Sequence, residues 1–383
     1  MPKGKVSIKD FYNINDLLPP QVLLEVFKLC RPEQIRPICK HWYKATQNDI
    51  LWKCWYQDKF TNKKLKESWQ ESYFYMLFLE NNWINNRFFN KNFYDNSWIT
   101  NCKLFNNTII TTSQWGFIKE WDLNTILNQN TNNSLPFVYS GNIGPIHCLD
   151  CNESLIVTGS DDGVIKIWKR NKMNYTKMLT YHHQDVFCIK IIEDKIISGS
   201  KDNIIYVYDL KTLNKTILKG HTHSVWSIEK KNDTLFSSSL DGTVRIWNLN
   251  NKNEYDCTTC LEISKYAVLK IVLFKNFLIV ATWNGKIEIW NIHEKELTYS
   301  ITAHSDYISG LKCFNDILVS SSYDNQVKIW KITTKGFIGL KLVNVLDLEK
   351  ITCLDINEKE LVCCSSLGKI HYFNFDVKKS IIV

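Results

Sequence analysis

The sequence contains no pattern typical of secretion or of a membrane-spanning helix. Its first residues, MPKGKVSIKDF, hold no apolar segment like the centre of a secretory signal peptide. The longest apolar run, residues 266–283, is interrupted by Lys270 and Lys275, which makes it unsuited to cross a bilayer. We therefore expect a protein of the cytoplasm, the nucleus or both, without a membrane partner.

The sequence also lacks the common motifs of catalysis. It has no Gly-rich phosphate loop, no HExxH and no GxSxG pattern. We expect no catalytic residues and no cofactor. An enzyme stays open as a weaker alternative, and it would need carboxylates or a histidine that converge at one place in the fold.

The sequence also lacks a stripe of clustered basic residues. The 47 basic and 39 acidic residues give a net charge of +8, but the lysines are dispersed along the chain. A nucleic-acid groove needs basic side chains gathered on one face, whereas dispersed charge favours solubility. We expect no nucleic-acid partner.

Cysteine is present, although its spacing does not predict a metal site. The 13 cysteines without a secretory signal indicate free thiols in a reducing compartment. Two pairs have the spacing of metal ligands, Cys148–Cys151 and Cys257–Cys260. The first pair recurs at equivalent positions of a repeat, as small buried residues do, and the second has no further Cys or His pair nearby. We expect no metal.

Internal repetition organises the chain beyond residue 97. The segment from Val225 to Trp247 recurs six more times without insertion, at intervals of 47, 40, 39, 43, 40 and 43 residues between its last positions. The residues that match Trp247 are Trp121, Trp168, Tyr208, Trp290, Trp330 and Phe373. Each copy has two apolar strands joined by a tight turn such as Asp241-Gly242, whose residues tolerate the positive φ of two-residue hairpin loops.

These copies resemble WD repeats, and seven of them resemble a seven-bladed β-propeller over residues 85–383. The predicted fold class is thus mainly β, with a small all-α segment in front. A single copy cannot bury both faces of its sheet, whereas seven stacked in a ring can.

The WD family has a hydrogen-bond chain in which an aspartate holds a histidine, and a Ser or Thr links that histidine to the tryptophan. The resemblance places this chain on two complete sets of residues: His221, Ser237, Asp241, Trp247, and His304, Ser320, Asp324, Trp330. Blade three carries His182, Ser198 and Asp202 but ends in Tyr208. In blades one and seven, Trp115 and Leu367 replace the aspartate.

Two segments of the repeat region fall outside the pattern. The Asn-rich stretch LNTILNQNTNNSLP after blade one is predicted to be a disordered surface loop. We expect residues 87–93 to supply the outer strand that completes the last blade, although the terminal SIIV competes for the same edge.

Residues 14–60 resemble an F-box, a helical motif that docks on the Skp adaptor of a cullin–RING ubiquitin ligase. Two prolines open its first helix, and apolar residues follow at helical spacing. The adaptor-binding residues that the resemblance implies are Leu18, Pro19, Val22, Leu23, Val26, Phe27 and Trp42. Between Leu29 and Cys39 the chain is about one helical turn shorter than the usual motif and contains Pro37, which predicts a short or kinked second helix.

An alternative for the same segment is a helical cap on the propeller, because an amphipathic helix by itself indicates only that it packs on something. Residues 61–84 form the expected helical linker, with an unusually aromatic helix over 65–83. In F-box proteins with WD repeats such a linker holds the propeller at a set distance from the adaptor.

The whole pattern resembles the substrate receptors of SCF-type ubiquitin ligases, and a non-ligase WD-repeat scaffold is the alternative. On this resemblance the propeller's top face binds a target protein. The repeat alignment places no arginine there, and it offers mainly aromatic side chains, with Lys201 as its permanent cation. The substrate-binding residues predicted from these columns are His147, Phe187, Lys201, Trp226, Trp283 and Tyr323. The rings could instead simply fill the channel mouth.

Overall fold

The computed structural model describes residues 52–53, 56–57, 60, 64–128, 135–141, 144–250, 255–334 and 338–377. The chain divides into two compact units, Met1–Asn81 and Asn82–Val383. Helix α5 (Trp69–Ile84) begins in the first unit and confirms the helix expected in the linker. None of the helices in the described part of the chain combines the length and the hydrophobicity that a membrane crossing needs.

Aromatic packing explains the composition of α5. In the first unit, Trp52 and Tyr56 are buried, with ring centroids 5.5 Å from Tyr73 and 5.4 Å from Trp69. The helix begins with a capping box, in which Ser68 Oγ accepts from the Glu71 amide at 3.1 Å and a Glu71 carboxylate oxygen accepts from the Ser68 amide at 3.2 Å. These aromatic residues are therefore core residues of the first unit.

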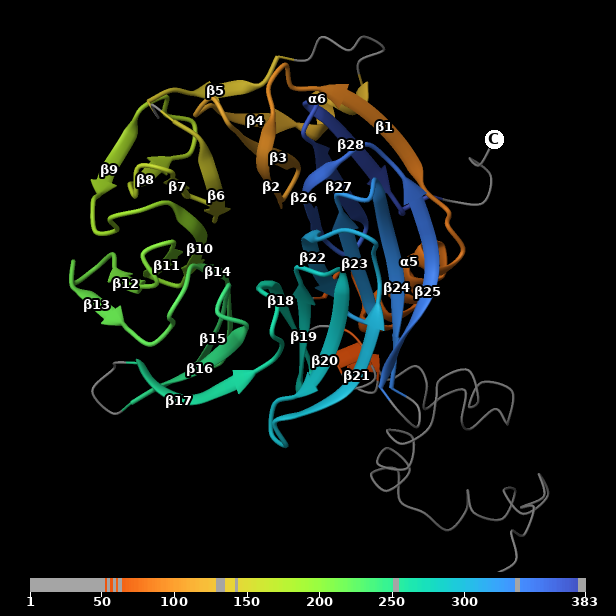
Figure 1. The fold of residues 1–383 in the computed structure, drawn as a ribbon. Coiled ribbons are helices and arrows are strands. Elements are labelled where there is room, and N and C mark those ends of the chain that lie inside the picture. Colours follow the sequence, from red (N-terminus) through yellow and green to blue (C-terminus); the bar gives the residue numbers. More distant parts are fainter. Residues whose placement is uncertain are drawn as a thin grey trace, which may run out of the picture. The chain divides into compact units, whose positions relative to one another are not determined.

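The second unit is a ring of seven four-stranded antiparallel sheets, so the predicted seven-bladed propeller is confirmed (Figure 1). Blades one to three consist of β2 (Ile99–Phe105), β3 (Thr108–Ser113), β4 (Ile118–Asp122), β5 (Phe137–Tyr139); β6 (Ile146–Cys151), β7 (Leu155–Ser160), β8 (Ile165–Lys169), β9 (Tyr175–Leu179); and β10 (Val186–Ile192), β11 (Lys195–Ser200), β12 (Ile205–Asp209), β13 (Lys215–Leu218). Blades four to six consist of β14 (Val225–Lys231), β15 (Thr234–Ser239), β16 (Thr243–Leu249), β17 (Tyr255–Glu262); β18 (Val268–Phe274), β19 (Phe277–Thr282), β20 (Lys286–Asn291), β21 (Glu296–Thr302); and β22 (Ile308–Phe314), β23 (Ile317–Ser322), β24 (Gln326–Thr333), β25 (Gly339–Asp347). Blade seven consists of β26 (Ile351–Ile356), β27 (Glu360–Ser365), β28 (Lys369–Asn374) and β1 (Phe89–Tyr94).

The predicted turns adopt the positive φ that their asparagine and glycine residues tolerate. Asn203 and Asn325 have φ of 70° and 68°, and Gly242 has φ of 81°. A Cβ on Gly242 would lie 2.1 Å from the carbonyl oxygen of Ser264 in the connection to the next blade. Only glycine fits this turn, because the conformation and the space both exclude a side chain.

The core lies in the seams between blades. One seam cluster contains Ile197 and Val207 of blade three together with Val225, Leu235 and Trp247 of blade four. Each of these side chains has an exposed fraction of 5% or less. Burying one large apolar side chain stabilises the fold by roughly 1.5–3 kcal/mol, so the seams supply most of the stabilisation.

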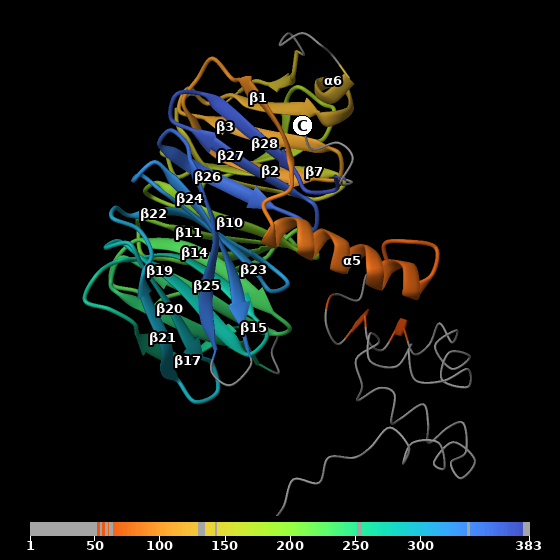
Figure 2. The same ribbon diagram turned by 90° about the vertical axis from the view of Figure 1, so that its right-hand side faces the viewer.

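Blade seven is closed by a strand from the other end of the repeat region. Strand β1 pairs with β28 from Phe89↔Asn374 to Tyr94↔Lys369, and the two lie side by side in both ribbon views (Figures 1 and 2). The expectation that residues 87–93 supply the outer strand is confirmed, with bounds of 89–94. The competing SIIV segment lies outside the described residues.

The hydrogen-bond chain forms where its residues are complete. In blade four, His221 joins Asp241 through Nδ1 and Ser237 through Nε2, both at 2.8 Å, and the Trp247 indole N–H donates to Ser237 Oγ at 2.9 Å. His304, Ser320, Asp324 and Trp330 repeat this geometry in blade six. In blade three His182 joins Asp202 and Ser198, both at 2.9 Å.

Blades without the full set use substitutes. In blade one Asp95 occupies the histidine position, accepts from Thr111 Oγ1 at 3.3 Å and pairs with Lys119, while Trp121 donates to Thr111 at 3.0 Å. In blade five the Trp290 indole donates to Glu288 at 3.1 Å because Val280 offers no hydroxyl.

One loop prediction was wrong in part. The segment after blade one begins with a short helix, α6 (Leu123–Asn128), where we expected disorder. Leu123 and Ile126 are buried against the core cluster that contains Trp121, and Asp122 caps the helix by accepting from the Asn124 amide at 3.0 Å. The Asn-rich composition of the segment favoured a loop, but Leu123 and Ile126 are spaced as on one face of a helix.

Asp241→Ala should lower the stability of the propeller more than Asn284→Ala does. Asp241 holds His221 and also accepts from the amides of Thr222 and Thr243 at 3.0 Å, whereas Asn284 accepts from Thr282 Oγ1 alone. Loss of a charged hydrogen bond costs roughly 1.5–3 kcal/mol. Thermal unfolding followed by circular dichroism measures the difference, and equal melting shifts would contradict it.

Candidate ligand-binding channel

The inner strands of the seven blades surround a central cavity of about 440 Å³. These strands are β2, β6, β10, β14, β18, β22 and β26, which lie nearest the centre of the ring in Figure 1. All seven inner strands carry a bulge at the same place, which lies between Val225 and Ser227 in blade four. In the other blades it lies at Ile99/Asn101, Ile146/Cys148, Val186/Cys188, Val268/Lys270, Ile308/Gly310 and Ile351/Cys353. The residue within the bulge, Trp226 in blade four, lines the channel.

Aromatic rings form two groups around the channel mouth. His147, Phe187 and Trp226 come from successive blades, and the Phe187 and Trp226 rings stack with centroids 4.7 Å apart. On blades five and six, Tyr307 lies between Trp283 and Tyr323, with centroid distances of 4.9 and 4.3 Å. Trp98 and Trp283 are 44% and 49% exposed, so rings remain available at this rim.

Four of the six residues predicted to bind a target line the channel: His147, Phe187, Trp226 and Tyr323. Trp283 is not part of the lining, but it extends the rim through its contact with Tyr307. Lys201 lies outside the lining, and its ammonium is 3.6 Å from Asp185, so it already has a carboxylate partner. The repeat alignment therefore placed most of the predicted aromatic residues in the channel lining, whereas the predicted cation, Lys201, lies outside it.

Two polar atoms at this level have no hydrogen-bond partner among the described residues, His147 Nε2 and Trp226 Nε1. The nearest carboxylate oxygen to His147 Nε2, on Asp185, is 4.0 Å away. Burial lowers the pKa of His147, and attraction to Asp185 and Asp161 opposes this only in part. The imidazole is thus neutral at pH 7, and the Trp226 indole N–H is a buried donor without a partner among the described residues.

Deeper in the channel, charges of alternating sign follow the ring. They stand three residues after the Trp226 position of each inner strand, roughly 10 Å further along it. In blade order they are Lys103, Asp150, Lys190, Glu229, Val272, Lys312 and Asp355. All but Val272 and Asp355 belong to the channel lining. Ion pairs join Lys103 to Asp150 at 3.0 Å, Lys190 to Glu229 at 2.9 Å and Lys312 to Asp355 at 3.2 Å.

This charge ring, the six charged residues above, is electrically balanced. Burial alone would lower the pKa of Lys103, but Asp355 and Asp150 on either side raise it above its ordinary value. Burial would likewise raise the pKa of Asp150, and Lys103 and Lys190 hold it low instead. The neighbouring carboxylates likewise raise the pKa of Lys190, and the neighbouring lysines lower that of Asp355, so these four groups are charged at neutral pH. The ring as a whole holds three lysines and three carboxylates.

Lys270 is the exception among the channel lysines. It precedes Val272, the neutral position of the ring, by two residues on β18 and lines the same channel. Among the described residues it has neither an ion-pair partner nor a hydrogen-bond partner, and burial lowers its pKa. The equivalent residues of the other blades are Asn101, Cys148, Cys188, Ser227, Gly310 and Cys353, all smaller than lysine.

Several of these residues were missed from the sequence. Trp98, Asp185 and Tyr307 share one column of the repeat, directly before the first inner-strand residue, which we did not consider. The charge ring occupies another column, three positions after Trp226. Both signals were present in the same gapless alignment, and no arginine lines the channel in the described part of the chain.

The predicted adaptor-binding residues lie outside the described residues. They are Leu18, Pro19, Val22, Leu23, Val26, Phe27 and Trp42. Their role remains a prediction from the sequence.

The cysteines of the first pair with metal-ligand spacing do not converge. Cys148 packs in the seam between blades two and three, and Cys151 packs in the seam between blades one and two. On β17 Cys257 and Cys260 pair with Trp247 and Arg245 across a bulge and so share one face of the sheet, but among the described residues no third ligand joins them.

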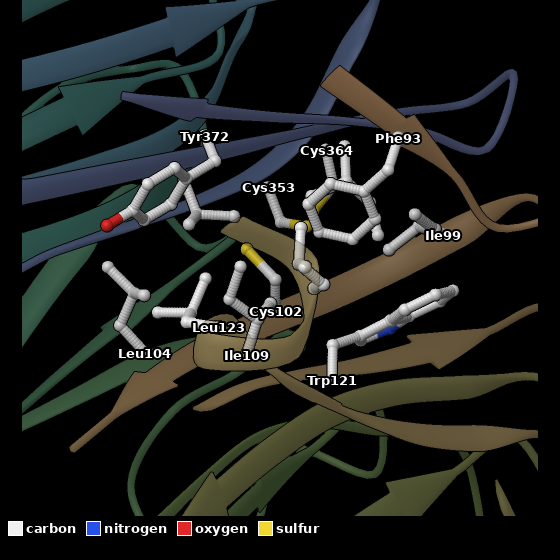
Figure 3. Packing of buried hydrophobic residues seen from close by; sticks show 13 residues of the cluster. Phe93, Ile99, Cys102, Leu104, Ile109, Trp121, Leu123, Cys353, Cys364 and Tyr372 are labelled. Atoms are coloured by element: carbon white, nitrogen blue, oxygen red, sulfur yellow. The ribbon is translucent and has the colours of Figure 1, made fainter. Parts of the chain in front are cut away.

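A different group of thiols does converge. The sulfur atoms of Cys102, Cys353 and Cys364 lie within 4.8 Å of one another, where blade one meets blade seven (Figure 3). Hydrogen bonds from Cys353 and Cys364, together with burial, raise the pKa of Cys102. Apolar side chains enclose the group, so we assign these thiols to core packing.

Comparisons with known proteins agree with the propeller. Residues 133–169 and 212–248 match the family model of the WD domain, G-beta repeat, and residues 304–375 match that of the TEP-1 C-terminal beta-propeller. The chain carries WD repeats.

The similar proteins are distant. The chain is 24% identical over 150 residues to WD repeat-containing protein pop2 of Schizosaccharomyces pombe, covering 30% of this chain and 21% of that protein. It is 25% identical over 111 residues to F-box/WD repeat-containing protein sel-10 of Caenorhabditis elegans, covering 29% and 19%. The solved structure of U3-55K has a TM-score of 0.65 at 16% identity and covers 74% of this chain and 98% of that one, which supports the fold alone.

Lys270→Met should raise the stability of the protein, whereas Lys190→Met should lower it. The first change removes a cation that has no carboxylate partner, with an expected gain of roughly 1–2 kcal/mol. The second leaves Glu229 unpaired in the channel, with an expected loss of roughly 1–3 kcal/mol. Urea unfolding of both variants measures the two changes, and equal losses would show that Lys270 has an internal partner.

Proposed function

We propose that this protein is the substrate-recognition subunit of an SCF-type ubiquitin ligase. Residues 14–60 bind a Skp-type adaptor and through it the cullin–RING core, and the channel mouth binds a target protein. The observation that carries the proposal is the order of the chain: a segment that resembles an F-box, then helix α5, then a WD-repeat propeller with an aromatic mouth. The similarity over 111 residues to sel-10, whose name joins F-box and WD repeat, supports the combination of the two in one chain.

The aromatic mouth supports the target-binding half of the proposal. Aromatic side chains dominate the binding energy of protein interfaces, and here Phe187, Trp226 and Tyr323 lie together at one rim. The buried indole donor of Trp226 offers a hydrogen bond to an incoming backbone or side-chain oxygen. On this proposal the chain performs no chemistry itself, and it acts in the cytoplasm or nucleus by holding target lysines near the ligase core.

A second candidate is a WD-repeat scaffold without a ligase partner. The family models match only segments of the propeller, and pop2 is named for its WD repeats alone. On this alternative the N-terminal segment packs on the propeller or binds another protein. Adaptor binding separates the two candidates.

Leu23→Asp or Phe27→Asp should abolish adaptor binding, since a carboxylate buried in the apolar interface without a partner costs several kcal/mol. Lys28→Ala is the matched control, because helical spacing places Lys28 opposite the apolar face. Affinity purification of the full-length protein, with partners identified by mass spectrometry, gives the readout. Equal adaptor recovery from Leu23→Asp and wild type would reject the ligase proposal.

Trp226→Ala combined with Tyr323→Ala should release the target, with a loss of about 2 kcal/mol or more in binding free energy. Phosphatase treatment of the target should leave capture unchanged. A phosphate carries nearly two negative charges and favours convergent arginines, and the described channel lining has none. Tyr94→Ala on the outer strand β1, where the ring is 57% exposed, is the control. Loss of capture after dephosphorylation would contradict this prediction.

A further inference from the structure

The channel contains one lysine, Lys270, without a carboxylate partner among the described residues. The six members of the charge ring pair with one another and leave no carboxylate for it. Lys270 is half-buried in the channel lining, and burial lowers the pKa of its side chain. An ammonium in such a place is costly unless an anion or several acceptors surround it.

Lys270 stands at nearly the same depth as the unpartnered indole donor. Trp226 is on β14 and Lys270 is on the neighbouring strand β18, one residue beyond Leu269, which matches Trp226 in the repeat. The two strands are linked where the Ile271 amide donates to Ser227 Oγ at 3.4 Å. One residue of strand advances about 3.3 Å, so Trp226 and Lys270 occupy adjacent positions along the depth of the channel.

We propose that the channel receives an acidic side chain, aspartate or glutamate, of a bound protein segment, whose carboxylate pairs with Lys270 and accepts a hydrogen bond from Trp226 Nε1. A carboxylate brings the single negative charge that one ammonium balances. Its oxygens also accept the indole N–H, which the protein itself leaves without a partner. The aromatic rim then contacts the apolar neighbours of that side chain.

The other cations of this region are unsuited to the same task. Lys103, Lys190 and Lys312 each pair with a carboxylate of the ring. Lys201 is 52% exposed and pairs with Asp185, so a ligand would have to displace that partner. This makes Lys201→Met the matched control: it removes a lysine close to the mouth but leaves the spare cation in place.

The inference rests on the proposed capture of a target at the channel mouth, and it does not depend on adaptor binding. Its failure is distinguishable from failure of the proposed function. If Trp226→Ala with Tyr323→Ala releases the target while Lys270→Met binds as wild type does, only the carboxylate inference is wrong. If the double variant still captures the target, the proposed binding face is wrong as well.

The probe is a library of random twelve-residue peptides displayed on phage through their C-terminal ends and selected on the full-length protein. Peptides selected on wild type and on Lys201→Met should share one acidic residue beside aromatic or aliphatic residues. Selection on Lys270→Met should lose the acidic preference. We expect this variant to be more stable than wild type, so loss of folding would not explain the result.

Synthetic peptides with acetylated and amidated ends then quantify the effect through the channel tryptophan fluorescence. Replacing the acidic residue by its amide should weaken binding to wild type at least tenfold and should leave binding to Lys270→Met unchanged. The inference is overturned if no peptide is enriched, if the selected peptides lack an acidic residue, or if Lys270→Met keeps the preference. It is also overturned if binding requires a free peptide C-terminus, because the ligand would then be a chain end.

Discussion

Burial of both faces of every blade is the constraint on which the rest of this structure depends. A four-stranded sheet leaves both faces open to water unless a neighbour covers each, and the seam clusters contain residues of two adjacent blades. Closure of the ring covers the faces of the first and last blades that would otherwise be open to water. Strand β1 completes blade seven, and Phe93 and Ile99 then share one cluster with Tyr372.

Because the seams supply most of the stabilisation, the polar chain within a blade is free to vary. Blades four and six have the complete set from aspartate to tryptophan, while blade one uses Asp95 and blade five uses Glu288. In each case a buried indole N–H still finds an acceptor, since leaving one unpaired costs more than changing its partner. The exception is Trp226, whose indole lies in the channel and not in a seam.

The number of blades also constrains the charges of the channel. Opposite charges cannot alternate around seven positions without a neutral position or two like charges side by side. Val272 is the neutral position, between Glu229 and Lys312 along the ring. The three lysines and three carboxylates of the ring pair with one another, so Lys270 is left without a carboxylate partner among the described residues. The aromatic mouth therefore opens onto a cavity whose described lining holds one lysine without a carboxylate partner and no arginine.

The sequence by itself determined the seven repeats, their strands and turns, the outer strand of blade seven and some of the aromatic residues of the channel, namely Phe187, Trp226 and Tyr323. These features depend on local spacing: alternation predicts strands, Asn and Gly predict the turns, and a gapless repeat places equivalent residues at equivalent positions. The helix at Leu123–Asn128 was missed because burial of Leu123 and Ile126 outweighed its polar composition. Only the tertiary structure decided which charges pair, since Lys103 meets Asp150 from a neighbouring blade 47 positions away, whereas Lys270 meets no carboxylate among the described residues. Pairing across a ring depends on which side chains reach the same point in space, and no spacing along one strand determines that.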